Sequence, residues 1–185
     1  MAKTYTLHVA GLTRELPICK INDHLDIAAF IMFSDVELTI ACAKALLEKC
    51  PDFDVILTAE AKGIPLAYEM SRQSGKQWIP ARKGVKGYMT DPVIVEDQSI
   101  TTAGTQKLYL GRDDADLIRG KRILIMDDVI STGGSLHALE TLVQAAGGTV
   151  ADRVAVLAEG AAKDRKDIKF LAPLPVFNAD GSIKG

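Results

Sequence analysis

The chain has 185 residues, 48% of them hydrophobic and 25% charged, and a formal net charge of −2. This length and composition are typical of a single soluble α/β domain, and the small negative charge provides no field that would attract nucleic acid or an anionic membrane. No apolar run reaches the roughly 18 residues of a membrane span, and residues 1–20 lack the apolar core of a signal peptide. The three cysteines have neither disulfide-framework nor zinc-site spacing. We therefore expect a cytoplasmic protein with reduced thiols and without a nucleic-acid or membrane partner.

The first half of the chain alternates between predicted strands and predicted helices. Its clearest helix start is Ser34-Asp35-Val36-Glu37, which fits a capping box with Ser34 as the N-cap and Glu37 three residues later. Residues 14–33, before this start, follow no regular period. The elements predicted here, in chain order, are a strand at 4–10, a helix from 34 to Pro51, a strand at 54–57, a helix at 64–75 and a strand at 77–81.

The second half resumes the alternation after a long irregular stretch. Residues 84–107 show no sustained period, and such a long loop in a compact domain is usually a lid or a binding loop. Strands separated by helices predict a parallel sheet covered on both faces, with a core at 34–159 and a small cap from the chain ends, about 1–33 and 160–185. The elements predicted in this half are strands at 108–110, 123–126, 150–157, 169–172 and 175–177, and helices at 114–119 and 136–146.

The most informative segment is the run from Ile123 to Ser135. Four apolar residues, typical of a buried parallel strand, end at Asp127 and Asp128, and a loop of hydroxyls and glycines then leads into a helix. Open α/β sheets bind ligands at the carboxyl ends of their strands, so we expect a site at this loop. The glycines let backbone N–H groups approach an anion at the helix N-terminus, whereas two adjacent carboxylates suit sugar hydroxyls or a divalent cation. The segment therefore predicts a ribose 5-phosphate ligand.

This run resembles the phosphoribosyl pyrophosphate (PRPP) motif of type I phosphoribosyltransferases, in which an apolar strand, an acidic pair and a Thr/Ser-Gly-Gly-Thr/Ser loop follow one another. Neither the nucleoside triphosphatase loop G-x-x-x-x-G-K-[ST] nor a dinucleotide fingerprint after a strand is present. The resemblance implies a parallel sheet flanked by helices, a small hood from the chain ends, and transfer of ribose 5-phosphate from PRPP to a nitrogenous base with release of pyrophosphate. The residues it assigns to the ribose and the 5-phosphate are Asp127, Asp128, Ser131, Thr132, Gly133, Gly134 and Ser135.

A second loop at the same sheet edge follows the strand at 54–57. Glu60-Ala61-Lys62-Gly63 is similar to the Glu-Ser/Ala-Arg-Gly of adenine phosphoribosyltransferases, with Lys in place of Arg, and an Arg-Lys pair follows the third strand as it does in that family. Taken alone, the loop could be an ordinary βα turn and the pair two solvated cations at a strand end. The residues that the resemblance assigns to pyrophosphate are Glu60, Ala61, Lys62, Gly63, Arg82 and Lys83.

The loop at 84–107 departs from the adenine enzymes, which have a Tyr-Glu-Tyr-Gly-like stretch where this chain has Gln98–Thr102. Its catalytic candidates are Lys86, Tyr88 and Glu96, and we assign Glu96 a catalytic role beside Asp127 and Asp128. We expect the loop to be a mobile lid that shields a developing sugar cation from water. The alternative is a fixed arm that packs on another subunit.

The sequence indicates the acceptor base less directly than it indicates PRPP. A faint likeness of residues 11–35 to the hood segment of purine enzymes places Arg14 and Leu16 at the base. We expect a purine, adenine first and xanthine or hypoxanthine next; the alternative is a non-catalytic PRPP-sensing regulatory protein of the same fold. The resemblance further implies Mg²⁺ held chiefly by substrate oxygens with help from Asp127 and Asp128, and a homodimer.

Overall fold

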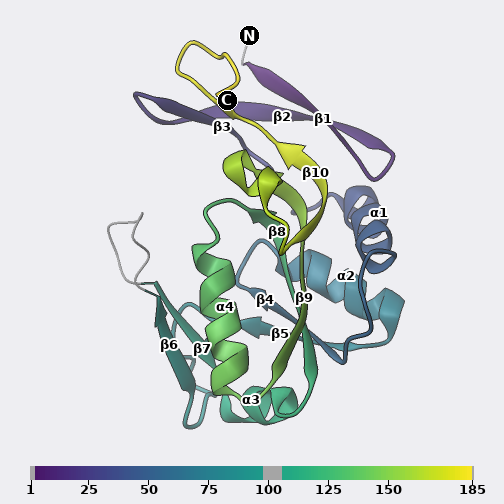
Figure 1. Ribbon diagram of the computed structural model, residues 1–185, viewed down its shortest axis with the longest axis vertical. Helices are drawn as coiled ribbons and strands as arrows, with labels where there is room; N and C mark the ends of the chain where they lie inside the picture. Colours follow the sequence, from purple (N-terminus) through teal and green to yellow (C-terminus); the bar gives the residue numbers. More distant parts are fainter. Residues whose placement is uncertain (1–2, 98–105, 185) are drawn as a thin grey trace.

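A five-stranded parallel sheet lies at the centre of the molecule (Figure 1). The computed structural model describes residues 3–97 and 106–184. All four strand pairings of this sheet are parallel, as predicted from the alternation of strands and helices. The strands, in spatial order, are β10 (Lys169–Leu174), β9 (Thr149–Glu159), β8 (Arg122–Ile130), β4 (Val55–Ala59) and β5 (Gln77–Ala81).

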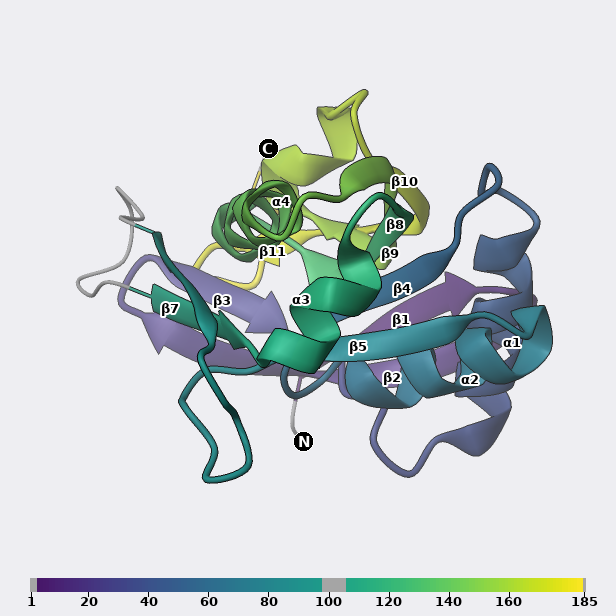
Figure 2. The same cartoon turned by 90° about the horizontal axis from the view of Figure 1, so that it is seen from below.

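Helices cover both faces of this sheet (Figure 2). The side chains of β8 alternate between two apolar cores: Ile123 and Ile125 belong to one, Leu124 and Met126 to the other. Because both faces are buried, the strand is apolar at successive positions, which is the pattern that identifies it in the sequence. The helices are α1 (Val36–Leu47) and α2 (Ile64–Ser74) on one face, and α3 (Arg112–Ile118) and α4 (Gly134–Ala145) on the other. None of the helices in the described residues is both long and apolar enough to span a membrane.

The start of α1 corrects the predicted cap. The sequence predicts Ser34 as the N-cap, but the structure places Asp35 there, where its Oδ1 accepts a hydrogen bond from the Leu38 N–H at 3.1 Å. Ser34 has a φ of 68° and belongs to the turn before the helix. Both side chains can cap, and Asp35 has in addition a tertiary contact with Arg14 at 2.7 Å, which favours it as the cap.

A smaller sheet lies beyond the carboxyl ends of the central strands and contains both chain ends (Figure 1). The sequence predicts no regular structure over 14–33, but β2 and β3 lie there, because most side chains of β2 are exposed and leave little apolar alternation to detect. Residues 169–174, predicted in the hood, instead form β10 at the edge of the central sheet. The small sheet consists of β1 (Thr4–Val9), β2 (Leu12–Asn22), β3 (Leu25–Ala28) and β11 (Val176–Phe177).

An antiparallel hairpin of β6 (Val93–Asp97) and β7 (Gln106–Leu110) packs beside α4. This hairpin occupies part of the stretch at 84–107 that the sequence predicts as irregular, and the segment Gln98–Thr102 lies outside the described residues. Val95 and Leu108 are buried in the core on the α4 side, so the hairpin has an apolar anchor. Paired backbone hydrogen bonds between Arg82 and Tyr109, at 2.8 and 2.9 Å, join the hairpin to the end of β5.

Candidate active site

The acidic pair lies within a strand, three to four residues before the loop that follows it. The sequence predicts that the strand ends at Asp127, but β8 continues through Asp128 to Ile130. Hydrogen bonding to β9 on one side carries the strand past the two carboxylates. The loop then turns at Gly133, whose φ of 88° is a left-handed conformation that favours glycine, and α4 begins at Gly134.

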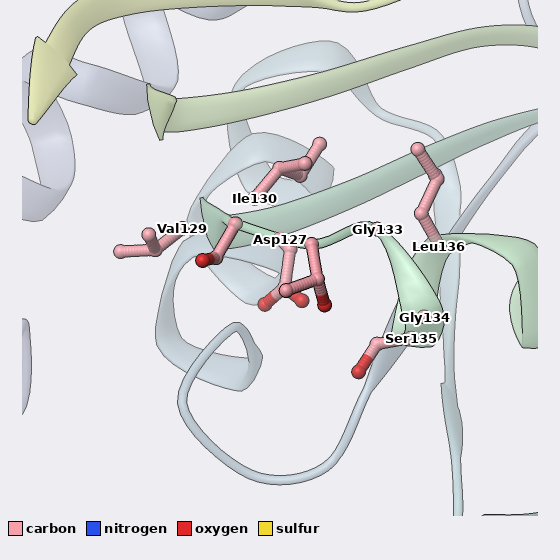
Figure 3. Close-up of a pocket in the computed structure, with 9 residues that line it drawn as sticks. Asp127, Val129, Ile130, Gly133, Gly134, Ser135 and Leu136 are labelled. Carbon is pink, nitrogen blue, oxygen red and sulfur yellow. The ribbon is translucent and has the colours of Figure 1, made fainter. Parts of the chain in front are cut away.

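Strand, loop and helix together line a cavity of about 120 Å³. Asp127 at the strand and Ser135 in the first turn of α4 both point toward it (Figure 3). The open backbone N–H groups and the positive dipole end of a twelve-residue helix favour an anion here. The residues that line this cavity are Asp127, Val129, Ile130, Ser131, Thr132, Gly133, Gly134, Ser135 and Leu136.

The two carboxylates share one poorly hydrated environment. Asp128 is only 2% exposed, and Asp127 Oδ1 accepts a hydrogen bond from the Asp128 N–H at 2.8 Å. Burial first, and the negative charge of Asp128 second, raise the pKa of Asp127 well above the usual Asp range. Lys62 opposes this rise, and its Nζ lies 3.0 Å from Asp128 Oδ2. The pair is therefore a concentrated acceptor site with one cation already beside it.

The loop between β4 and α2 approaches the acidic pair closely because of a glycine. A Cβ built on Gly63 would lie 2.3 Å from Thr58 Oγ1 and 3.3 Å from Asp127 Oδ1, so a side chain there would displace the loop or the carboxylate. Lys62 pairs with Asp128, so two consecutive residues of this loop lie beside the two acidic residues of β8. The structure thus places the loop that follows β4 against the acidic pair, at the same sheet edge as the glycine loop.

The Glu60 carboxylate contacts three basic residues that follow β5. Its carboxylate accepts a hydrogen bond from the Lys83 N–H at 2.6 Å and lies 3.1 Å from Arg82 Nε. Lys86 Nζ is 3.8 Å from the same carboxylate. Glu60 therefore faces the side chains of Arg82 and Lys86 and the backbone of Lys83, and it can orient the two cations for an anion bound at the edge of the loop. Lys86 is a member of this cluster that its spacing in the sequence does not reveal.

Glu96 lies on β6 and pairs with Lys107 across the hairpin. Its side chain is 53% exposed, and other residues line the cavity beside α4. Tyr88, the other hairpin-side candidate, is 72% exposed. In this structure neither side chain is held at the acidic pair by a contact among the described residues.

The two residues predicted at the base are engaged elsewhere. Arg14 binds Asp35 and Glu37, each at 2.7 Å, at the start of α1, and Leu16 is buried in the apolar core beneath the small sheet. A cavity of about 430 Å³ adjoins Ser131 and Thr132 of the glycine loop. Its other lining residues come from the end of β9, the short 3₁₀ helix η1 (Gly160–Asp164) and the small sheet: Leu25, Glu159, Gly160, Ala161, Lys163, Asp164, Val176 and Lys184.

Comparison with known proteins gives a consistent picture. The family model described as phosphoribosyl transferase domain matches residues 37–180. The chain is 33% identical over 118 residues to adenine phosphoribosyltransferase of Thermotoga petrophila, covering 64% of this chain and 66% of that one. It is 34% identical over 133 residues to hypoxanthine/guanine phosphoribosyltransferase of Methanothermococcus okinawensis, covering 69% of each.

The match to the Thermotoga relatives is partial, because the chain spans 66% of the T. petrophila protein and 55% of its Thermotoga neapolitana counterpart. Among solved structures, adenine phosphoribosyltransferase of Thermoanaerobacter pseudethanolicus superposes with a TM-score of 0.61 at 25% identity, over 74% of this chain and 79% of that one. Fold and sequence thus point to the same group of proteins.

Proposed function

This chain belongs to the phosphoribosyl transferase family, and from that premise we propose that it transfers the phosphoribosyl group of PRPP to a purine base. Pyrophosphate is the second product, and the reaction serves nucleotide salvage. The relatives named as adenine and as hypoxanthine/guanine enzymes support a purine as acceptor. Adenine is our first choice because Glu60–Gly63 is similar to the corresponding loop of the adenine enzymes.

The observation that carries this proposal is the close approach of the loop at residues 60–63 to the acidic pair of β8, from which the glycine loop follows. Lys62 and Gly63 lie beside Asp128 and Asp127, and the glycine loop of residues 131–135 begins three residues beyond. PRPP has a phosphate at one end of its ribose and a pyrophosphate at the other. A site with hydroxyl acceptors between two anion cradles matches that distribution of charge.

Each part of the site then has a role in the reaction. Asp127 and Asp128 accept hydrogen bonds from the ribose hydroxyls, and each bond is worth about 1.5–3 kcal/mol when the accepting carboxylate is ionised. Residues 131–135 bind the 5-phosphate, and residues 60–63 with Arg82 and Lys83 bind the pyrophosphate. Lys86 adds a further cation through Glu60.

The bond between C1 and pyrophosphate breaks with positive charge developing on the sugar ring, so the protein acts by positioning and electrostatics. Holding base and PRPP in register contributes on the order of 7–11 kcal/mol. The segment 84–107 serves as the lid that excludes water from the sugar cation, and Glu96 acts within that lid. Its position on the hairpin means that it would reach the substrate after the lid closes.

Mg²⁺ fits this donor set as an ion that is bound mainly by oxygen atoms of the substrate. Asp128 Oδ2 is buried, with only the Lys62 ammonium beside it at 3.0 Å among the described residues, and carboxylate oxygens are ligands that Mg²⁺ prefers. No group of three His, Cys, Asp or Glu side chains gathers around one point within residues 3–97 and 106–184, so substrate oxygens would complete the coordination. Asp127 and Asp128 would hold the ion, and its charge would stabilise the departing pyrophosphate.

The base enters the larger cavity beside Ser131 and Thr132. This cavity lies between the central sheet and the small sheet, which we propose as the hood. Its polar side chains of both signs, Glu159, Asp164, Lys163 and Lys184, can read the donors and acceptors of a purine edge. Xanthine or hypoxanthine is the second candidate.

We also propose that the protein works in the cytoplasm as a homodimer. Large apolar side chains of α1, α2 and the segment before α1 remain exposed, among them Phe33, Val36 and Tyr68. Sedimentation velocity at micromolar concentration would show twice the monomer mass, and a monomer at all concentrations would overturn this assignment.

The activity is tested with a panel of bases. Purified protein with Mg²⁺ and PRPP should convert adenine to AMP and release an equal amount of pyrophosphate. Turnover of hypoxanthine or xanthine alone would change the base and keep the reaction. If adenine, hypoxanthine, guanine, xanthine and orotate all fail while PRPP still binds, the protein is a PRPP-sensing regulator of the same fold.

A further inference from the structure

The phosphate loop contains no basic side chain of its own. Residues 131–135 are Ser-Thr-Gly-Gly-Ser, so the loop offers hydroxyls, backbone N–H groups and a helix N-terminus to an anion. A doubly charged phosphate gains more from a nearby full positive charge than from dipoles alone. Any such cation must come from another part of the chain.

Arg165 supplies it. This residue follows η1, on the connection between β9 and β10. A Cβ built on Gly133 would lie 2.3 Å from Arg165 Nη1 and 3.5 Å from its Cζ. The guanidinium therefore occupies the space that a side chain at position 133 would need, directly against the tightest turn of the phosphate loop.

The orientation of this guanidinium is fixed by Asp167. Arg165 Nε donates to Asp167 Oδ1 at 3.0 Å and Nη2 donates to Oδ2 at 2.6 Å, so Asp167 binds two of the three guanidinium nitrogens. Nη1, the nitrogen that faces Gly133, makes no hydrogen bond to another described residue. The Nη1 edge of the cation is thus left available at the loop.

We propose that Arg165 is a positioning residue for the 5-phosphate: it holds Gly133 in its left-handed turn and adds positive charge beside the anion. The proposal rests on the assignment of residues 131–135 to the 5-phosphate. It makes the connection between β9 and β10 part of the PRPP site, with Asp167 fixing the side chain that does the work.

The test compares two ligands by calorimetry: ribose 5-phosphate, which needs the phosphate loop, and inorganic pyrophosphate with Mg²⁺, which needs the loop at residues 60–63. Arg165→Ala should weaken ribose 5-phosphate binding by about tenfold or more, which is about 1.4 kcal/mol, and leave pyrophosphate binding within about twofold. Arg165→Lys keeps the charge but loses the fork, so it should give an intermediate loss. Lys166→Ala is the matched control, because it removes the same charge from the neighbouring exposed residue.

The outcomes separate this inference from the proposed function. Equal ribose 5-phosphate affinity for Arg165→Ala and Lys166→Ala would overturn the role of Arg165 while the site assignment stands. Wild-type protein that binds no ribose 5-phosphate would overturn both. If Arg165→Ala fails to fold, Arg165→Lys and Asp167→Asn decide: wild-type affinity for ribose 5-phosphate in both variants would exclude a positioning role.

Discussion

At the scale of single residues, Asp127 and Asp128 combine burial with adjacent negative charge, and both properties matter for ligand binding. In the free protein Lys62 is the cation beside them. Replacing both by Asn keeps the shape of the side chains and removes the charged acceptors. Asp127→Asn with Asp128→Asn should abolish tight PRPP binding, because each charge-assisted bond contributes about 1.5–3 kcal/mol.

Calorimetry with Mg²⁺ and PRPP measures this loss, and circular dichroism checks that the fold persists. Asp116→Asn is a suitable control, because Asp116 is an exposed carboxylate on α3 whose partner is Arg119. Wild-type affinity in the double variant would remove Asp127 and Asp128 from the site.

The raised pKa of Asp127 predicts how stability depends on pH. Burial and Asp128 raise the pKa of Asp127 to about 8 in the folded protein, whereas an unfolded Asp titrates near 3.9. Between these values the folded state holds a proton that the unfolded state has released. The contribution of Asp127 to the free energy of unfolding is therefore complete below the unfolded pKa. It decreases as the pH rises toward the folded pKa, by at most about 1.4 kcal/mol per pH unit.

Urea denaturation of wild type and Asp127→Asn from pH 5 to pH 9 measures this dependence. The stability of the variant relative to wild type should increase with pH, since Asn cannot release a proton. Parallel curves would show that Asp127 titrates normally.

At the scale of elements, the site depends on how closely the loop before α2 approaches β8. Gly63→Ala places a methyl group 2.3 Å from Thr58 Oγ1. Overpacking of this kind destabilises by about 1–3 kcal/mol, and displacement of the loop should also weaken pyrophosphate binding. Gly111→Ala is the control, because a Cβ there comes no closer than 3.7 Å to its neighbours. Thermal unfolding and pyrophosphate calorimetry should separate the two variants, and identical behaviour would contradict the close approach.

A second prediction at the scale of elements concerns the hairpin of β6 and β7. If the segment 84–107 is a lid, its amides should exchange hydrogen fast in the free protein and slowly with PRPP and a base analogue bound. Replacing the part between the strands with a short Gly-Ser turn should reduce turnover by about tenfold or more and leave PRPP affinity largely unchanged. Equally slow exchange in both states would favour a fixed arm, and joint loss of turnover and PRPP affinity would make the segment part of the binding site.

At the scale of the whole molecule, the proposed base cavity exists because the chain ends meet the central sheet. Glu159 ends β9, whereas Lys184 and Val176 come from the C-terminal segment that completes the small sheet. Glu159→Gln removes a charged acceptor from this cavity but keeps its volume. We expect the KM for the base to rise about tenfold with the KM for PRPP unchanged.

Steady-state kinetics with each substrate varied in turn provides the measurement for Glu159→Gln. Lys166→Ala serves again as a control, because it lies outside the cavity. A larger change in the KM for PRPP than in that for the base would place Glu159 at the sugar and not at the base.

The sequence by itself determined the features that depend on neighbouring residues. The apolar strand, the acidic pair and the glycine loop are consecutive, so the family and the parallel sheet could be read from residues 123–135. Helix α2, with Pro65 near its start and Gly75 at its end, was equally local. By contrast, Ser34 and Asp35 can both cap α1, and the largely exposed β2 has too little apolar alternation to be recognised.

The tertiary structure alone decided which residues from different elements meet. Glu60 faces Arg82 and Lys86, and Arg165 lies against Gly133, although more than twenty residues separate each of them from its partner. It also moved β10 into the central sheet and directed Arg14 to the start of α1. Such contacts are set by packing and by the pairing of charges across the fold, and no short-range pattern in the sequence encodes them.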